Sequence, residues 1–223
     1  MIKLVLFDLD GTFVDTAYDL IEVANKVYIN NNKSVISYEV GREIASDGIS
    51  AFLKLKFDEN NDDFDSLSKE FLTIYNNHFL NNALLFDGII NVLEILEKKD
   101  IRWGIVTNKA RFFSEKILIS HQLMDKCSVL MCGDDIGFKP KPSPELLIEA
   151  CNLLDVSVSD TIYIGDGHRD VISAKSAKIK SVLACYGYLK KTDFIKDWKP
   201  DYIINKPLEI LNLDCFSFNN SLS

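Results

Sequence analysis

The chain has 223 residues, 47% of them hydrophobic and 26% charged, and a net charge of −8 at pH 7. This composition is typical of a soluble globular protein, and the acidic balance disfavours binding to the phosphate backbone of nucleic acids. The sequence lacks an apolar run long enough for a membrane span or a signal peptide, and its five cysteines include no C-x-x-C pair, so we expect a cytoplasmic protein with reduced thiols that binds neither nucleic acid nor membrane.

The first predicted element is a strand over residues 3–7, and a block of helical patterns follows it. An acidic, Asn-rich segment at 58–65 interrupts this block and is typical of a solvated loop. We find no strand pattern in the block, which is most simply interpreted as a helical insertion, residues 16–84, lying over a sheet. Its helical patterns occupy residues 16–30, 37–57 and 66–81.

From residue 85 onward, helical segments alternate with apolar segments that have the continuous hydrophobicity of strands buried on both faces of a parallel sheet. This alternation predicts an α/β fold whose core consists of residues 1–15 and 85–223, with the last dozen residues as a loose tail. In chain order, the segments are a helix at 88–99, a strand at 102–107, a helix at 110–122, a strand at 128–132, a helix at 143–154, a strand at 161–165, a helix at 169–178, and strands at 181–184 and 202–204.

Polar side chains follow the predicted strands at the carboxyl ends, where ligands bind in open α/β sheets. Asp8 and Asp10 come directly after the first strand, and Thr107 and Asn108 stand at the end of the strand at 102–107. The two carboxylates suit either one shared site or a plain acidic turn. The hydroxyl and amide of Thr107-Asn108 suit an oxyanion, although this pair is also a common way to end a strand.

A third group of residues has two parts. The segment Lys139-Pro140-Lys141-Pro142-Ser143-Pro144 fixes a lysine in extended chain before a helix, and Asp166 and Asp170 follow the strand at 161–165. A lysine neutralises phosphate charge, and carboxylates hold a hard cation. Each part alone is also explained as a turn, but the three groups together, at the ends of successive strands, predict one site.

With these motifs, the sequence resembles the haloacid dehalogenase-like hydrolases over nearly the whole chain. Members of this family have a Rossmann-like core, often with a helical cap inserted after the first strand. The resemblance implies a three-layer, parallel-sheet core with a small α-helical cap. Asp8-Leu9-Asp10-Gly11-Thr12 matches the family's D-x-D-G-T motif, which implies that Asp8 is the nucleophile and Asp10 the general acid/base.

The other motifs imply residues that bind the phosphate group. Thr107 matches the phosphate-binding residue of the family's second motif, and Asn108 beside it is expected to contact substrate as well. Lys141 matches the lysine of the third motif. Lys139 is the alternative, but the spacing of 25 residues to Asp166 favours Lys141.

The fourth motif, G-D-x-x-x-D, implies a magnesium site. Asp166 is the expected Mg²⁺ ligand, together with Asp8 and the backbone carbonyl of Asp10. Asp170 and Thr12 are expected beside these ligands, where Asp170 tunes the metal without binding it directly.

The inserted helices contain the candidates for substrate selection. Asp47 and Gly48 belong to a segment, Ser46-Asp47-Gly48, that we expect between two helices of the cap, where it can reach the substrate. Arg42 and Lys54 flank this segment and either hold an anionic group of the substrate or lie on helix surfaces.

The resemblance implies a Mg²⁺-dependent phosphomonoester hydrolase that forms an aspartyl-phosphate. A phosphate dianion repels a carboxylate nucleophile, so its charge has to be neutralised, which Mg²⁺, Lys141 and Thr107 would do. Asp10 then protonates the leaving alkoxide and activates water. This second aspartate separates the chain from haloacid dehalogenases proper, which attack carbon, need no Mg²⁺ and lack it.

Within the family, the chain resembles the phosphoglycolate phosphatase-like subgroup. A narrower similarity to the N-acetylmuramic acid 6-phosphate phosphatases rests on three groups of residues: Leu85-Phe86-Asp87-Gly88, the run from Trp103 to Lys109, and Tyr186-Gly187-Tyr188 followed by Trp198, Asp201 and Pro207-Leu208-Glu209. We expect a small phosphorylated metabolite as substrate and a monomer or homodimer. Two alternatives stay open: a sugar-phosphate mutase of the same branch, and a catalytically idle binding or regulatory protein.

Overall fold

The sheet is built around β1 (Leu4–Phe7), and the computed structural model describes residues 1–216 of the chain. Five further strands extend this sheet in parallel orientation: β4 (Arg102–Val106), β5 (Leu130–Met131), β6 (Thr161–Gly165), β7 (Lys180–Ala184) and β8 (Tyr202–Ile204). The strand order is β5-β4-β1-β6-β7-β8, so β1 lies between β4 and β6. The carboxyl ends of these three neighbouring strands therefore meet at one edge of the sheet.

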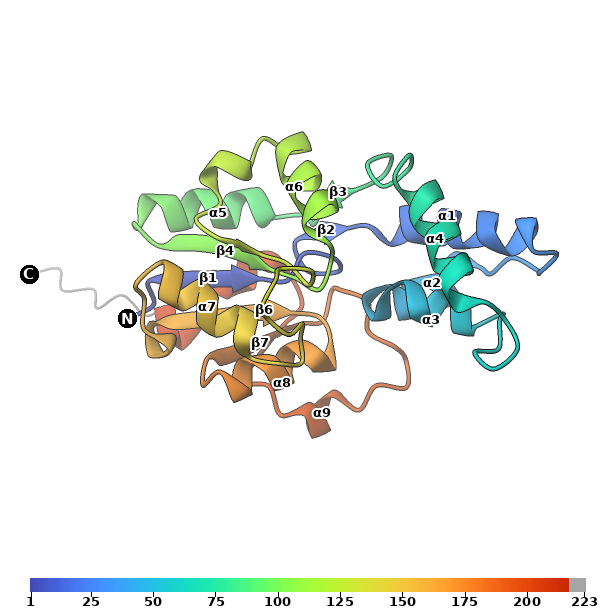
Figure 1. Ribbon diagram of the computed structural model, residues 1–223. Coiled ribbons are helices and arrows are strands. Elements are labelled where there is room, and N and C mark those ends of the chain that lie inside the picture. The colour runs from blue at the N-terminus through green and yellow to red at the C-terminus, as the bar shows by residue number, and fades with distance from the viewer. Residues whose placement is uncertain (217–223) are drawn as a thin grey trace, which may run out of the picture.

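Helices cover both faces of the sheet (Figure 1). Val5 and Phe7 belong to the same apolar core as α5 and α6, whereas Leu4 and Leu6 point to the other face and join the core with α7 and α8. This three-layer α/β arrangement confirms the predicted fold class. The four helices are α5 (Ile89–Lys98), α6 (Arg111–Ser120), α7 (Glu145–Leu153) and α8 (His168–Ser176).

A block of helices, which we call the cap, follows β1 and lies beyond the carboxyl ends of the strands (Figure 1). Tyr28, Phe52 and Phe71 are fully buried within it, and the Tyr28 hydroxyl donates to the carbonyl of Phe52 at 2.5 Å. The pattern at 37–57 forms two helices, and the segment Ser46-Asp47-Gly48 lies where they meet, as expected, because Gly48 has a φ of 76° and interrupts the helix. The cap consists of α1 (Ala17–Asn30), α2 (Tyr38–Ile44), a 3₁₀ turn (Ala45–Asp47), α3 (Gly48–Lys54) and α4 (Phe64–Tyr75).

Two short strands, β2 (Val14–Asp15) and β3 (Leu84–Leu85), carry the chain into and out of the cap as an antiparallel pair. The sequence does not predict them, since two residues are too few to show a period. The hydroxyl of Tyr188 in the core ties this connection down, because it accepts the backbone N–H of Thr16 at 2.7 Å and donates to Asp15 at 2.7 Å. We propose that core and cap divide at these strands, at residues 15/16 and 84/85.

The chain after β7 completes the core with α9 (Ile195–Trp198) and two 3₁₀ turns, Pro207–Asn212 and Asp214–Phe216. Phe216 is buried against the apolar core, so the expectation of a loose tail is wrong up to this residue. The rest of the expected tail, residues 217–223, lies outside the described residues. Among residues 1–216, no helix combines the length and apolarity needed to cross a membrane.

Candidate active site

Four of the predicted site residues meet at the carboxyl edge of the sheet. Asp8 follows β1, Thr107 follows β4, Asp166 follows β6, and Lys141 comes from the loop that leads into α7. All four are buried, and even the most accessible, Asp8, is only 8% exposed. Gly11 allows the loop after β1 to pass close to the Asp166 carboxylate, because its φ is +80° and a Cβ at this position would lie 2.2 Å from that carboxylate.

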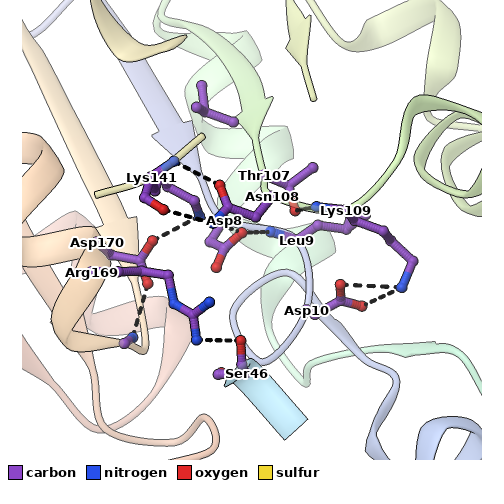
Figure 2. Close-up of polar contacts among 12 residues, drawn as sticks. Asp8, Leu9, Asp10, Ser46, Thr107, Asn108, Lys109, Lys141, Arg169 and Asp170 are labelled. Carbon is purple, nitrogen blue, oxygen red and sulfur yellow. Dashed lines mark hydrogen bonds and ion pairs between the residues drawn. The ribbon is translucent and has the colours of Figure 1, made fainter. Parts of the chain in front are cut away.

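Lys141 connects the carboxylates of two motifs. Its Nζ lies 2.8 Å from Asp8 Oδ1 and 2.7 Å from Asp170 Oδ1 (Figure 2). It also donates to the Tyr163 hydroxyl at 2.7 Å. Burial alone would lower the pKa of Lys141, but the charges of Asp170 and Asp8 outweigh it and raise that pKa, so the side chain stays a cation. Lys139 instead lies exposed, 3.7 Å from Glu145.

The loop after β4 holds the backbone of Lys141 through the side chain of Asn108. The Asn108 side-chain amide donates to the Lys141 carbonyl at 2.9 Å and accepts the Lys141 N–H at 2.8 Å. The Thr107 hydroxyl accepts the N–H of Lys109 at 3.1 Å. Because its amide already holds the backbone of Lys141, a direct contact of Asn108 with substrate stays a prediction.

Asp8, Asp166 and Asp170 form a cluster whose carboxylate oxygens lie within 4.8 Å of one another. The Oδ2 of Asp166 accepts hydrogen bonds from the Ser46 hydroxyl at 2.6 Å and the Tyr188 N–H at 2.8 Å, whereas its Oδ1 is buried with no partner among residues 1–216. Asp170 has partners for both oxygens, since Lys141 contacts Oδ1 and the Gly167 N–H donates to Oδ2 at 2.9 Å. An all-oxygen cluster with an unpaired buried carboxylate oxygen fits a hard cation such as Mg²⁺.

The burial of this cluster changes its proton affinity. Burial raises the pKa of Asp8 to about 6, with Lys141 opposing the rise, and burial together with the charges of Asp8 and Asp170 raises the pKa of Asp166 to about 7. A divalent cation would oppose both shifts, because its positive charge favours the ionised form of each carboxylate.

Asp10 points away from this cluster, toward Lys109 (Figure 2). The Lys109 Nζ lies 3.1 and 3.2 Å from the two oxygens of Asp10, and the Thr16 hydroxyl donates to Asp10 at 2.5 Å. The same ammonium group donates to the hydroxyl of Tyr75 in the cap at 2.7 Å. Lys109 was not among the predicted site residues, although its place two residues after Thr107 was an available signal. No sequence signal pointed to Tyr75.

A cavity of about 490 Å³ lies between the cap and the core. Asp8, Asp10, Thr107 and Lys141 line its core side, so the two acids that share one motif face one space. The opposite wall is largely apolar and comes from the cap and α6, with Leu20, Ile49, Leu72, Tyr75 and Phe113. Such a mixture of convergent polar groups and apolar walls is typical of small-molecule sites.

The cap segment predicted to reach the substrate lies at this cavity. Gly48 and Asp47 both line it, but the Asp47 carboxylate pairs with Arg169 at 2.8 Å and with Lys190 at 2.6 Å. A substrate contact of Asp47 or Gly48 stays a prediction. Thr12 is fully buried, and its hydroxyl has no partner among residues 1–216, so its expected place beside the metal ligands stays a prediction.

The two flanking basic residues have protein partners away from the cavity. Arg42 donates to the Tyr186 carbonyl at 2.9 Å and lies over the ring of Tyr188. Lys54 pairs with Glu59 at 2.8 Å on the surface of the cap. Lys54 therefore agrees with the interpretation of a helix-surface residue, whereas Arg42 is half-buried and connects the cap to the core.

The chain is similar to known proteins in both sequence and fold. Residues 5–184 match the model of a family described as haloacid dehalogenase-like hydrolase. An N-acetylmuramic acid 6-phosphate phosphatase of Pseudomonas putida is 32% identical over 94% of each chain, and a phosphoglycolate phosphatase of Xanthomonas campestris is 32% identical over 93% of this chain and 94% of its own. A crystal structure described as a predicted phosphoglycolate phosphatase from Haemophilus somnus shares the fold, with a TM-score of 0.83 over 95% of this chain and 97% of its own, at 24% identity. The chain therefore belongs to the haloacid dehalogenase-like hydrolase family and is similar over nearly its whole length to phosphatases of that family.

Proposed function

We propose that this haloacid dehalogenase-like phosphatase is a Mg²⁺-dependent phosphomonoester hydrolase that works through an aspartyl-phosphate on Asp8. The observation that carries the proposal is the position of the Asp8 carboxylate, which is held by Lys141 beside the Asp166 carboxylate and faces the cavity that Asp10 also lines. A nucleophile, a cation beside it and a second acid in one cavity are the groups that phosphoryl transfer requires.

In the first half of the proposed reaction, a carboxylate oxygen of Asp8 attacks phosphorus and the bond from phosphorus to the ester oxygen breaks. Lys141 and the Thr107 hydroxyl stabilise the charge on the equatorial phosphate oxygens. Asp10 gives its proton to the departing alkoxide. In the second half, Asp10 takes a proton from water, the water oxygen attacks phosphorus, and the bond to Asp8 breaks, which releases phosphate and restores the carboxylate.

The carboxylates of Asp8 and Asp166, together with the backbone carbonyl of Asp10, would hold the Mg²⁺ ion. When bound, this ion supplies the positive charge that lets a carboxylate approach a phosphate dianion. Asp170 would not bind the ion directly and would instead orient the site, because its oxygens fix Lys141 and the turn at Gly167.

The cavity favours a substrate larger than a two-carbon acid. Its volume of about 490 Å³ leaves room beyond the phosphate group, and the wall formed by Leu72, Tyr75 and Phe113 offers apolar contact. An amino-sugar phosphate that carries acetyl and lactyl methyl groups would use this wall, whereas 2-phosphoglycolate would leave it uncovered. We therefore favour N-acetylmuramic acid 6-phosphate, the substrate in the name of the Pseudomonas putida relative, over 2-phosphoglycolate.

The test is a phosphate-release assay with both compounds, hexose phosphates, nucleoside monophosphates and pyrophosphate, with Mg²⁺ and with EDTA. We expect EDTA to abolish release, and kcat/KM to be highest for the amino-sugar phosphate. Asp8→Asn should be inactive and folded. Release that persists in EDTA or in Asp8→Asn would refute the mechanism, and a preference for 2-phosphoglycolate would refute the substrate. Isomerisation of a hexose 1-phosphate without phosphate release would support the alternative of a sugar-phosphate mutase. If none of the compounds reacts, the result would support the alternative of a catalytically idle binding or regulatory protein.

A further inference from the structure

The 3₁₀ turn of the cap docks onto the core beside the proposed metal site. The Ser46 hydroxyl donates to Asp166 Oδ2 at 2.6 Å, which links a cap side chain directly to a carboxylate at the end of β6. Arg169 in α8 donates to the Ser46 carbonyl (Figure 2). It also donates to the Asp47 carboxylate at 2.8 Å. Lys190 of the core adds a second ion pair with Asp47 at 2.6 Å. The turn is therefore held to the core through both its backbone and its side chains.

The two carboxylate oxygens of Asp166 differ in their hydrogen-bond partners. Oδ2 is fixed from two sides, by Ser46 of the cap and by the Tyr188 N–H of the core. Oδ1 is buried and has no protein partner among residues 1–216, and the Asp166 carboxylate belongs to the cluster with Asp8. A carboxylate that is held through one oxygen presents the other in a fixed direction, which is how hydrogen-bond partners orient metal ligands.

We propose that Ser46 is a positioning residue that couples the placement of the cap to the binding of the cation. With the turn docked, Ser46 holds Asp166 so that Oδ1 faces the cation. By linkage, a bound cation stabilises the docked turn by the same free energy. This inference rests on the proposed Mg²⁺ site and adds that the affinity of that site depends on a residue of the cap.

The surroundings of Ser46 support this role. A second cavity, of about 290 Å³, lies on the other side of the turn and is lined by Asp166 and Tyr188, whereas Asp8 lines the first cavity. Ser46, Asp47, Lys141 and Arg169 line both cavities and so lie between them. Removal of the Ser46 hydroxyl would let water from the second cavity reach Oδ2 and leave the Tyr188 N–H as its one remaining protein partner among residues 1–216.

The first experiment measures Mg²⁺ binding to the full chain by titration calorimetry, with no substrate present. We expect Ser46→Ala to weaken binding about tenfold, the lower end of the effect of removing a partner that orients a metal ligand. Asp47→Asn, which loosens the same turn, should weaken it less, and Ser46→Thr, which keeps a hydroxyl, should bind nearly as the wild type does. The matched control is Ser50→Ala, an exposed serine in the first turn of α3, which should leave binding unchanged.

The second experiment tests the reciprocal effect through amide hydrogen exchange with and without Mg²⁺. The ion should slow exchange in the cap over residues 38–54 in the wild type, and this protection should disappear in Ser46→Ala. Unchanged or tighter Mg²⁺ binding in Ser46→Ala, or equal protection in both proteins, would overturn the coupling while leaving the proposed function intact. A wild type that binds no Mg²⁺ would overturn both.

Discussion

Replacement of Lys109 by Met tests whether Asp10 depends on a lysine that is not part of its own motif. The Lys109 ammonium contacts both oxygens of Asp10 and the hydroxyl of Tyr75, and its side chain is only 8% exposed. Met keeps the length and apolar stem of the side chain and removes the charge. Asp10 then keeps the Thr16 hydroxyl as its remaining partner among these groups and can turn about that single contact.

The size of the effect follows from the burial of the pair. Breaking a fully buried ion pair costs about 3–5 kcal/mol in the free energy of unfolding. The Asp10 side chain is 19% exposed and lines the cavity, so water can replace part of the lost contact, and we expect a cost of about 2 kcal/mol. The kinetic effect should be larger, because a positioned acid/base contributes roughly 10²–10⁴-fold to a rate, and we expect a loss of about 10²-fold in kcat.

The assay compares an alkyl phosphate with p-nitrophenyl phosphate. Nitrophenolate leaves without protonation, so formation of the aspartyl-phosphate from this compound does not need Asp10, whereas its hydrolysis does. In Lys109→Met we expect a rapid burst of nitrophenolate followed by slow turnover, and slow turnover with no burst for the alkyl ester. Lys139→Met, which removes an exposed lysine, is the control and should behave as the wild type. Unaltered kinetics in Lys109→Met, or equal losses in both half-reactions, would refute the reasoning.

Three further outcomes are expected. Lys141→Ala leaves Asp8 and Asp170 buried without their shared cation, so it should lower the free energy of unfolding in urea by about 3–5 kcal/mol and phosphate release by more than about 10²-fold. Tyr188→Phe removes the hydroxyl that accepts two backbone N–H groups where α1 begins, which should cost about 1–3 kcal/mol in the same urea measurement. Burial raises the pKa of Asp8 to about 6 and that of Asp166 to about 7. In EDTA, the folded protein therefore binds more protons than the unfolded chain between about pH 4 and pH 7. Its free energy of unfolding should fall as the pH rises through this range. Mg²⁺ should restore it near pH 7, and a thermal midpoint that rises with pH in EDTA would contradict the assignment.

The sheet and its flanking helices could be predicted from the sequence because its central strands, such as β1 and β6, are buried on both faces. Residues such as Leu4 and Phe7 therefore form apolar runs that stand out from the helical segments around them. The cap was harder to predict in detail. The strand pair at Val14 and Leu85 depends on a contact between residues far apart in the chain.

The same distinction explains which site residues could be found. Asp8, Thr107 and Asp166 each end a strand, and parallel topology brings strand ends together, so their meeting follows from the fold. Tyr75 and Ser46 reach the site from cap helices and turns, and their positions follow only from how the cap docks on the core. Sequence order carries no information about that docking.

The net charge of the chain was the poorest predictor of what the site binds, because the site contains its own set of charged groups. Asp8, Asp10, Asp166 and Asp170 stand against Lys109 and Lys141, which leaves two excess negative charges when all six groups are ionised. A divalent cation cancels this excess, and only then can a phosphate dianion approach the nucleophile at modest cost. The acidic balance of the whole chain therefore argues against binding nucleic acid, whereas the acidic balance of the site is what a magnesium-dependent phosphatase requires before it meets its substrate.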